Sequence, residues 1–180
     1  MSIHMMMADP PAPEAFETHW HILDKLLNTT AHAFDHLALR DVKGITNNEI
    51  EALYAMGYHY YRTGKLDAAL RIFKGLVTLD HLEARFWLGL GGVQQRLEAF
   101  ADATQSYAMA SLLDIHDPRP QLAAAECYLK LHQLHEADSA LLALERFCPY
   151  TEAYHLYRAK GRILRRCLNA LRQEEEGATL

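Results

Sequence analysis

A residue pattern that recurs every 34 residues constrains this chain more than any other feature of its sequence, and three copies of it fill residues 50–149. Small residues recur at two positions of the pattern, which are Gly57, Gly91 and Ala125 at the first and Ala69, Ala103 and Ala137 at the second. Large apolar residues recur between them, and Pro149 closes the third copy. Because two helices interlock when small and large residues alternate where they cross, the pattern predicts three helix pairs.

This period and these positions are typical of the tetratricopeptide repeat, a helix–turn–helix unit. The predicted helices span residues 47–63, 66–79, 84–97, 100–113, 118–131 and 134–147. One helix pair cannot bury its apolar face alone, and three stacked pairs are the usual minimum. The sequence therefore predicts an all-α solenoid of three helix pairs over residues 47–149.

The residues before the repeats are expected to form two further segments. Residues 1–13 carry prolines and little periodicity, which favours a mobile tail. Residues 14–46 form an N-terminal helical segment that ends in a loop at 40–46. Thr46 and Glu49 have the spacing of a capping box, which predicts the start of the first repeat helix.

After the repeats, Thr151 is expected to cap a last helix over residues 150–173. Such a helix would cover the apolar end that an open solenoid exposes. Residues 174–180 are expected to be a polar tail. Six basic residues lie along this helix: Arg158, Lys160, Arg162, Arg165, Arg166 and Arg172. They are interpreted as a solvated outer face, with a contact surface for an anionic partner as the alternative.

Composition and charge exclude several classes of protein. The formal net charge is −5, so the basic footprint of a nucleic-acid-binding protein is absent. No apolar run reaches the roughly 18 residues of a membrane span. The N-terminus lacks the basic start and apolar core of a signal peptide. Three widely spaced cysteines fit reduced thiols. These features together predict a cytoplasmic protein.

No motif of catalysis or cofactor binding is recognisable in the sequence. The chain has 11 histidines but no HExxH motif, and its cysteines form no CxxC pair. It has neither a glycine-rich phosphate loop nor a hydrolase or kinase motif. We therefore expect no enzyme activity, no metal and no cofactor.

The inner face of the repeats is the candidate binding site. In each repeat, positions 2, 5, 9, 12 and 13 of the first helix are expected to face this inner surface. The candidate peptide-binding residues are Tyr54, Tyr58, Tyr61, Arg62, Arg85, Leu88, Gln95, Arg96, Leu122, Glu126, Leu129 and Lys130. Tyrosines offer a large contact area and a hydroxyl group at little entropic cost, which suits capture of an extended peptide. In the competing interpretation, the tyrosines pack against the N-terminal helices and the cations pair with Asp67 or Glu98.

The chain resembles the class II chaperones of bacterial type III secretion, the SycD/LcrH/IpgC type, which guard hydrophobic translocators. The resemblance covers about residues 45–145. Its distinctive parts are the run of repeat one from ALYAMGYHYY to LDAAL, then LDHLEARFWLGLG, then DIHDPRPQLAAAEC. It implies an all-helical, three-repeat chaperone in the bacterial cytoplasm that neither inserts into a membrane nor binds nucleic acid directly.

The resemblance also implies a cargo and partners. Family members bind an extended, PxLxxP-like segment near the N-terminus of a pore-forming translocator. The family's aromatic pocket falls on Tyr54, Tyr58 and Tyr61, with Leu88 beside it, although the family often has Phe where Tyr58 stands. Members often dimerise through the helices before the repeats, here by Phe16, Trp20, Leu23 and Leu27. Some also act with a transcriptional regulator.

Two other functions fit the same fold. A chaperone for a needle or filament subunit would hold a helical segment rather than an extended one. A scaffold or regulatory adaptor of the secretion apparatus would bind a folded protein.

Overall fold

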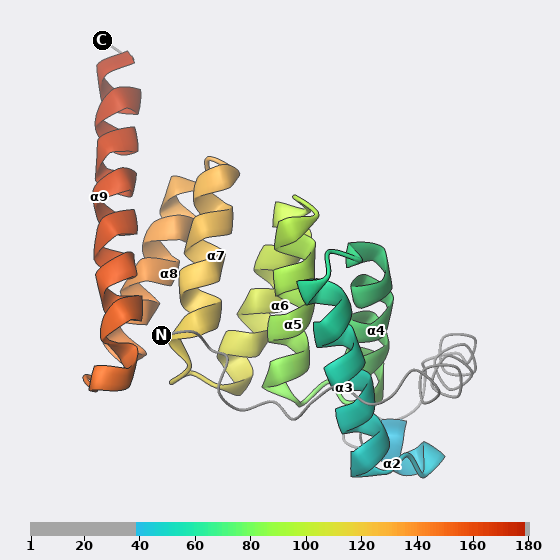
Figure 1. Cartoon of the computed structure of the whole chain (residues 1–180). Helices are drawn as coiled ribbons and strands as arrows, with labels where there is room; N and C mark the ends of the chain where they lie inside the picture. Colours follow the sequence, from blue (N-terminus) through green and yellow to red (C-terminus); the bar gives the residue numbers. More distant parts are fainter. Residues whose placement is uncertain (1–38, 179–180) are drawn as a thin grey trace. The chain divides into compact units, whose positions relative to one another are not determined.

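The computed structural model describes residues 39–178, which form helices and turns without a β-strand (Figure 1). The chain divides into two compact units, one ending at His81 and the other beginning at Leu82. Observed and predicted repeat helices agree within one residue at each end, so the all-α prediction and the pairing of helices are confirmed. The tail at 1–13 and the dimerisation residues Phe16, Trp20, Leu23 and Leu27 lie outside the described residues.

The first unit contains helices α2 (Leu39–Lys43), α3 (Asn47–Arg62) and α4 (Leu66–Leu79). The prediction of a loop over 40–46 was wrong for its first part, which belongs to α2. Arg40 forms an ion pair of 3.1 Å with Asp80, a largely buried residue just after α4. Gly44 follows α2 with a φ of 64°, a left-handed conformation that glycine adopts without steric cost.

Helix α3 begins at the capping box that the sequence predicted. The Glu49 N–H donates to the Thr46 hydroxyl oxygen at 3.3 Å, and the Thr46 N–H donates to Glu49 Oε2 at 2.8 Å. Helices α3 and α4 pack closely at Gly57, where a Cβ atom would lie 2.9 Å from Cγ2 of Ile72. This contact explains why the repeat has a small residue at this position.

The second unit contains two helix pairs and a long last helix. Its elements are α5 (Ala84–Arg96), α6 (Phe100–Leu113), α7 (Pro118–Lys130), α8 (Leu134–Phe147), the 3₁₀ turn η1 (Glu152–Tyr154) and α9 (His155–Ala178). Helix α5 packs on α6, α6 on α7, and α7 on α8. Its core includes two groups of buried side chains, one around Tyr107 and Cys127 and one around Leu141 and Leu144.

The turn inside each helix pair ends the first helix in the same way. In each turn, the third residue after the end of the first helix donates its N–H to the carbonyl five residues before it. In the first pair, the Lys65 N–H donates to the Tyr60 carbonyl at 3.0 Å. The residue before the donor has a positive φ, which is 78° at Gly64, 61° at Glu98 and 55° at His132. These are Schellman motifs, which usually have glycine at this position. Only Gly64 follows that preference.

The start and the end of the last helix differ from the prediction. The Thr151 side chain makes no capping hydrogen bond, and the Thr151 carbonyl instead accepts from the Tyr154 N–H at 3.2 Å, which forms the 3₁₀ turn. Helix α9 then continues to Ala178, five residues beyond the predicted end. Glutamines and glutamates are good helix formers, and Gln173 to Glu176 extend the helix into the expected polar tail.

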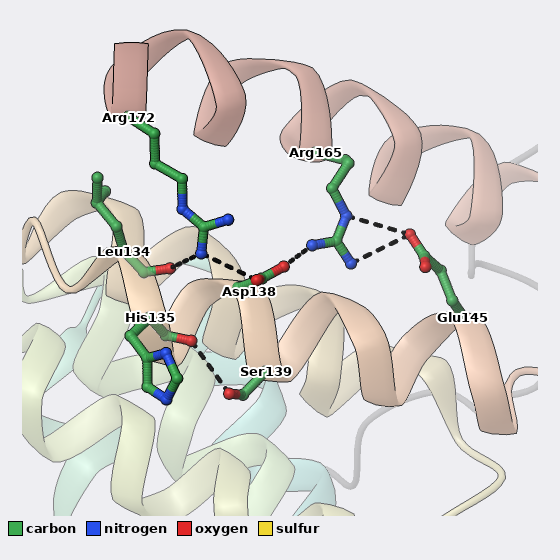
Figure 2. Close-up of polar contacts among 7 residues, drawn as sticks. All are labelled: Leu134, His135, Asp138, Ser139, Glu145, Arg165 and Arg172. Atoms are coloured by element: carbon green, nitrogen blue, oxygen red, sulfur yellow. Dashed lines mark hydrogen bonds and ion pairs between the residues drawn. The ribbon is translucent and has the colours of Figure 1, made fainter. Parts of the chain in front are cut away.

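Helix α9 packs on α7 and α8 through apolar and ionic contacts. Leu168 is fully buried, and Gly161 allows close approach because a Cβ atom there would lie 2.6 Å from Cδ2 of Leu144. Figure 2 shows Asp138 of α8 between Arg165 and Arg172 of α9, with an ion pair to each. Glu145 adds a second pair to Arg165, at 3.3 Å. The predicted cover on the end of the repeats is therefore present in this unit.

Candidate peptide-binding surfaces

In the first unit, three tyrosines of α3 form an aromatic surface. Tyr54, Tyr58 and Tyr61 are spaced by four and three residues, so they share one side of the helix, and each is half-buried. The rings of Tyr58 and Tyr61 stack with centroids 6.4 Å apart and planes at 29°. Tyr54 meets Phe73 of the core edge-on, with centroids 5.9 Å apart. The surface therefore has one ring anchored in the core and two that lie against each other.

The cation at the end of this helix, Arg62, is exposed. The competing interpretation placed N-terminal helices over the tyrosines, and those helices lie outside the described residues. Within the described part of the first unit, the half-buried rings and the exposed Arg62 are the candidate ligand contacts of α3. Aromatic rings with a polar tip suit a peptide that alternates apolar side chains with main-chain polar groups.

In the second unit, the candidate residues of α5 and α7 lie in three kinds of environment. Arg85, at the start of α5, pairs with the capping carboxylate of Glu83 at 3.2 Å. Arg119, the corresponding residue of α7, pairs with Asp117 at 2.7 Å. Leu88 and Leu129 are half-buried against the core, whereas Arg96 and Lys130 are exposed.

Leu122 differs from the expectation of an inward-facing surface residue. Its side chain is 4% exposed and packs in the core group that includes Leu141 of α8 and Leu168 of α9. Its position in the repeat register is the one that Tyr54 and Leu88 occupy in the other copies. The last helix adds apolar partners to the third helix pair, so Leu122 supports the surface from beneath rather than lining it.

A chain of hydrogen bonds connects three helices of this unit. The Tyr107 hydroxyl of α6 donates to Gln95 Oε1 of α5 at 2.6 Å. Gln95 Nε2 then donates to Glu126 Oε2 of α7 at 3.1 Å. Because a carboxylate only accepts, the amide must turn its NH₂ to Glu126, and its oxygen is left for the tyrosine hydroxyl. This Tyr107–Gln95–Glu126 relay holds the two candidate polar residues in one orientation.

Sequence reasoning identified Gln95 and Glu126 but missed the role of Tyr107. The signal was present, because the equivalent positions in the other two copies hold Phe73 and Leu141, which have no hydroxyl. A neighbouring buried bond was also missed: Ser106 of α6 donates to Gln94 Oε1 of α5 at 2.6 Å. Buried polar groups are costly unless paired, so both bonds select one packing of α5 on α6.

Cys127 follows Glu126 in the sequence and is buried in the core group that includes Tyr107. Burial, and secondly the charge of Glu126, raises the pKa of the Cys127 thiol to about 12. The thiol therefore stays protonated at neutral pH, and a thiol rather than a thiolate is a poor nucleophile and a poor metal ligand. Within residues 39–178, no three side chains of His, Cys, Asp or Glu gather closely enough to hold a metal ion. None of the described helices is both long and apolar enough to cross a membrane.

Comparison with known proteins identifies relatives of this chain among both curated sequences and solved structures. Low calcium response locus protein H of Yersinia pestis is 38% identical over 109 residues, which are 60% of this chain and 65% of that relative. The match thus spans slightly less than two thirds of the curated relative. Family models gave no match.

Solved structures extend the similarity over nearly the whole length of the relatives. PcrH of Pseudomonas aeruginosa, in complex with the chaperone binding region of PopD, is 36% identical, with a TM-score of 0.69. The match covers 72% of this chain and 97% of that one. The type III secretion chaperone SycD of Yersinia enterocolitica, in complex with a peptide of the translocator YopD, is 29% identical, with a TM-score of 0.67. That match covers 71% of this chain and 98% of the other.

Proposed function

The chain belongs to the class II chaperones of bacterial type III secretion, and on that premise we propose that it binds an extended segment of a hydrophobic translocator and keeps it soluble and competent for secretion. The observation that carries the proposal is that relatives covered over nearly their whole length were crystallised with segments of such cargo: PcrH with PopD and SycD with a YopD peptide. The protein would act in the bacterial cytoplasm, without catalysis or a cofactor.

The aromatic surface of α3 is the proposed contact for apolar cargo side chains. Tyr58 and Tyr61 present stacked rings on a helix that is anchored by its capping box and its packing on α4. Rings held in place lose little entropy when they bind, so the affinity gained per contact is larger than on a mobile loop. Arg62, Arg96 and Lys130 are exposed cations that would meet carbonyl groups or acidic side chains of the segment.

The Tyr107–Gln95–Glu126 relay is the proposed polar contact in the second unit. Glu126 Oε2 accepts from Gln95, so Oε1 remains able to accept a hydrogen bond from the cargo main chain. An extended peptide exposes its N–H groups, and a carboxylate is a strong acceptor for them. Arg85, Leu88 and Leu129 would complete this contact, with Leu122 as buried support.

The chaperone function follows from mass action. Translocators carry apolar segments that aggregate when they are free in water. A partner that binds the export-competent form lowers the concentration of the free protein without ATP. A homodimer and a transcriptional regulator are further proposed partners, because both occur among the chaperones that this chain resembles.

The test measures binding of two labelled peptides, the chaperone binding region of PopD and the YopD peptide, by fluorescence anisotropy. We expect Tyr58→Ala and Tyr61→Ala each to weaken binding by about 2 kcal/mol, roughly thirtyfold. Tyr60→Ala is the matched control, since Tyr60 is a half-buried tyrosine on another side of the same helix, where Lys65 lies 5.7 Å from its ring centre.

Equal losses in all three variants, with circular dichroism showing intact helices, would contradict the assignment of the aromatic surface. Failure of wild type to bind either peptide, together with capture of a needle or filament subunit on co-expression, would favour the alternative cargo.

A further inference from the structure

Helix α9 carries a second apolar stripe, apart from the side that packs on α7 and α8. The packed side includes Tyr157, Leu164, Leu168 and Leu171. The second stripe consists of Leu156, Ala159, Ile163, Cys167 and Ala170. Leu156 is 54% exposed and Ile163 is 59% exposed. The spacings of three, four, four and three residues keep these side chains on one line along the helix.

The charges that flank this stripe along its length are of one sign, and an acidic end of the helix begins only at Glu174. From His155 to Gln173 the helix contains six basic residues and no aspartate or glutamate. Arg165 and Arg172 pair with Asp138 and Glu145 of α8, which neutralises them (Figure 2). Arg158 donates to the carbonyls of Pro149 and Thr151.

Three cations remain beside the stripe, and all three are exposed: Lys160, Arg162 and Arg166. At 100° per residue, Lys160 borders one edge of the stripe, and Arg162 and Arg166 border the other. Within residues 39–178 none of the three forms an ion pair. The α9 stripe is therefore an apolar line between two positively charged edges.

We propose that the α9 stripe is a docking surface for an acidic amphipathic helix of another protein. Apolar residues at alternating spacings of three and four are the pattern with which one helix packs along another. Carboxylates on both sides of the partner's apolar line would meet Lys160 on one edge and Arg162 and Arg166 on the other. Such charge complementarity selects the partner and speeds its association.

Other occupants fit the stripe less well. A second copy of α9 would bring Arg162, Arg166 and Lys160 of one copy close to the same residues of the other, and these like charges would repel. A membrane-surface helix inserts large side chains such as Trp, Phe and Leu. The stripe has one leucine and one isoleucine, and its other members are alanine and cysteine. Nucleic acid would use the cations but gains nothing from the apolar line.

The test uses two designed helical peptides that share one leucine line. One has glutamates and the other has lysines at the flanking positions, and binding to the full chain is measured by fluorescence anisotropy at low and high salt. We expect only the glutamate peptide to bind, more weakly as salt rises. Ile163→Glu should abolish the binding, and the double variant Arg162→Gln/Arg166→Gln should weaken it about tenfold.

Leu112→Glu is the matched control, because Leu112 of α6 is 78% exposed and lies outside the stripe. It should leave the affinity unchanged. Equal binding of both peptides, or binding of the glutamate peptide that the double glutamine variant does not weaken, would overturn the proposal. So would self-association in sedimentation velocity that Ile163→Glu removes, or binding to anionic vesicles without binding to the glutamate peptide. The double variant Arg162→Gln/Arg166→Gln changes no apolar residue of the stripe. It therefore tests the proposal even if Ile163→Glu fails to fold.

Discussion

The ring of Tyr107 lies against Gly91 so closely that a Cβ atom at position 91 would lie 2.7 Å from the ring atoms Cδ1 and Cε1. The hydroxyl of the same ring donates to Gln95 Oε1 at 2.6 Å. One side chain therefore sets how α6 packs on α5 and also orients the polar group that holds Glu126. Packing of the repeat and the proposed peptide contact depend on each other at this residue.

Gly91→Ala should destabilise the protein by about 1–3 kcal/mol, because the added methyl group meets an aromatic ring that is held on all sides. Gly161→Ala is the matched comparison. Its Cβ would lie 2.6 Å from Cδ2 of Leu144, but this atom is the tip of a flexible side chain and can move. Urea unfolding of both variants measures the difference. Equal losses would show that the Tyr107 ring is not the rigid partner that the structure indicates.

Tyr107→Phe should weaken binding of a translocator peptide with a small loss of stability. The variant keeps the ring that packs on Gly91 and removes the donor to Gln95. We expect the lost hydrogen bond to cost about 1 kcal/mol, which corresponds to a loss of about fivefold in affinity. Titration calorimetry measures the affinity and urea unfolding the stability. Phe73→Tyr, the reverse change at the equivalent position, should not improve binding.

The repeat helices were predictable because the signals that define them are local. Small residues at fixed spacing set the helix crossings, and Thr46, Glu49 and Gly64 mark the ends of α3. The end of the N-terminal helical segment was placed too early, because the loop was predicted from residue 40 and α2 ends at Lys43. Arg40 in this part of α2 forms an ion pair with Asp80, a partner far away in sequence that no local pattern reveals.

The sequence predicted which repeat positions the candidate surface residues occupy, but not how exposed each side chain is. Repeat positions place Tyr58, Tyr61, Gln95 and Glu126 on first helices, and local spacing is sufficient for that. Leu122 is buried by a core that includes Leu168 of the last helix, and a repeat pattern contains no information about such a partner. The dimerisation and cargo roles remain predictions.

Glu98→Gly and His132→Gly should each stabilise the protein, by about 0.5–1 kcal/mol. Both residues adopt a positive φ after a helix, and a side chain in that conformation costs about 1–2 kcal/mol, which the greater flexibility of unfolded glycine only partly offsets. Thermal and urea unfolding measure the gain. Gly64→Ala, at the same point of the first repeat, should lose a similar amount. A loss in the two glycine variants would mean that the wild-type side chains stabilise the turn.

The stability of the protein should fall in alkaline solution partly through Cys127. Burial raises the pKa of this thiol from 9.0 to about 12 in the folded protein. Between these values the unfolded chain loses the proton and the folded chain keeps it, so stability decreases as pH rises, by up to about 1.4 kcal/mol per pH unit. Below pH 9 both states keep the proton and the effect is absent.

Urea unfolding of wild type and Cys127→Ala on both sides of pH 9 tests this. The advantage of wild type over the variant should shrink as pH rises, whereas other titrating groups affect both proteins alike. A constant difference across the range would show that the thiol titrates equally in both states.

Asp138 accepts from two arginines that stand seven residues apart on α9, so one carboxylate of α8 holds the last helix at two points two turns apart. A protein truncated after Gln173 keeps both arginines, whereas one truncated after Leu171 leaves the carboxylate with Arg165 alone. With both bonds, α9 cannot slide by one turn along α8 without breaking them together. The length of α9 that these ion pairs hold on α8 therefore ends at Arg172, which lies 34 residues after Asp138 in the sequence.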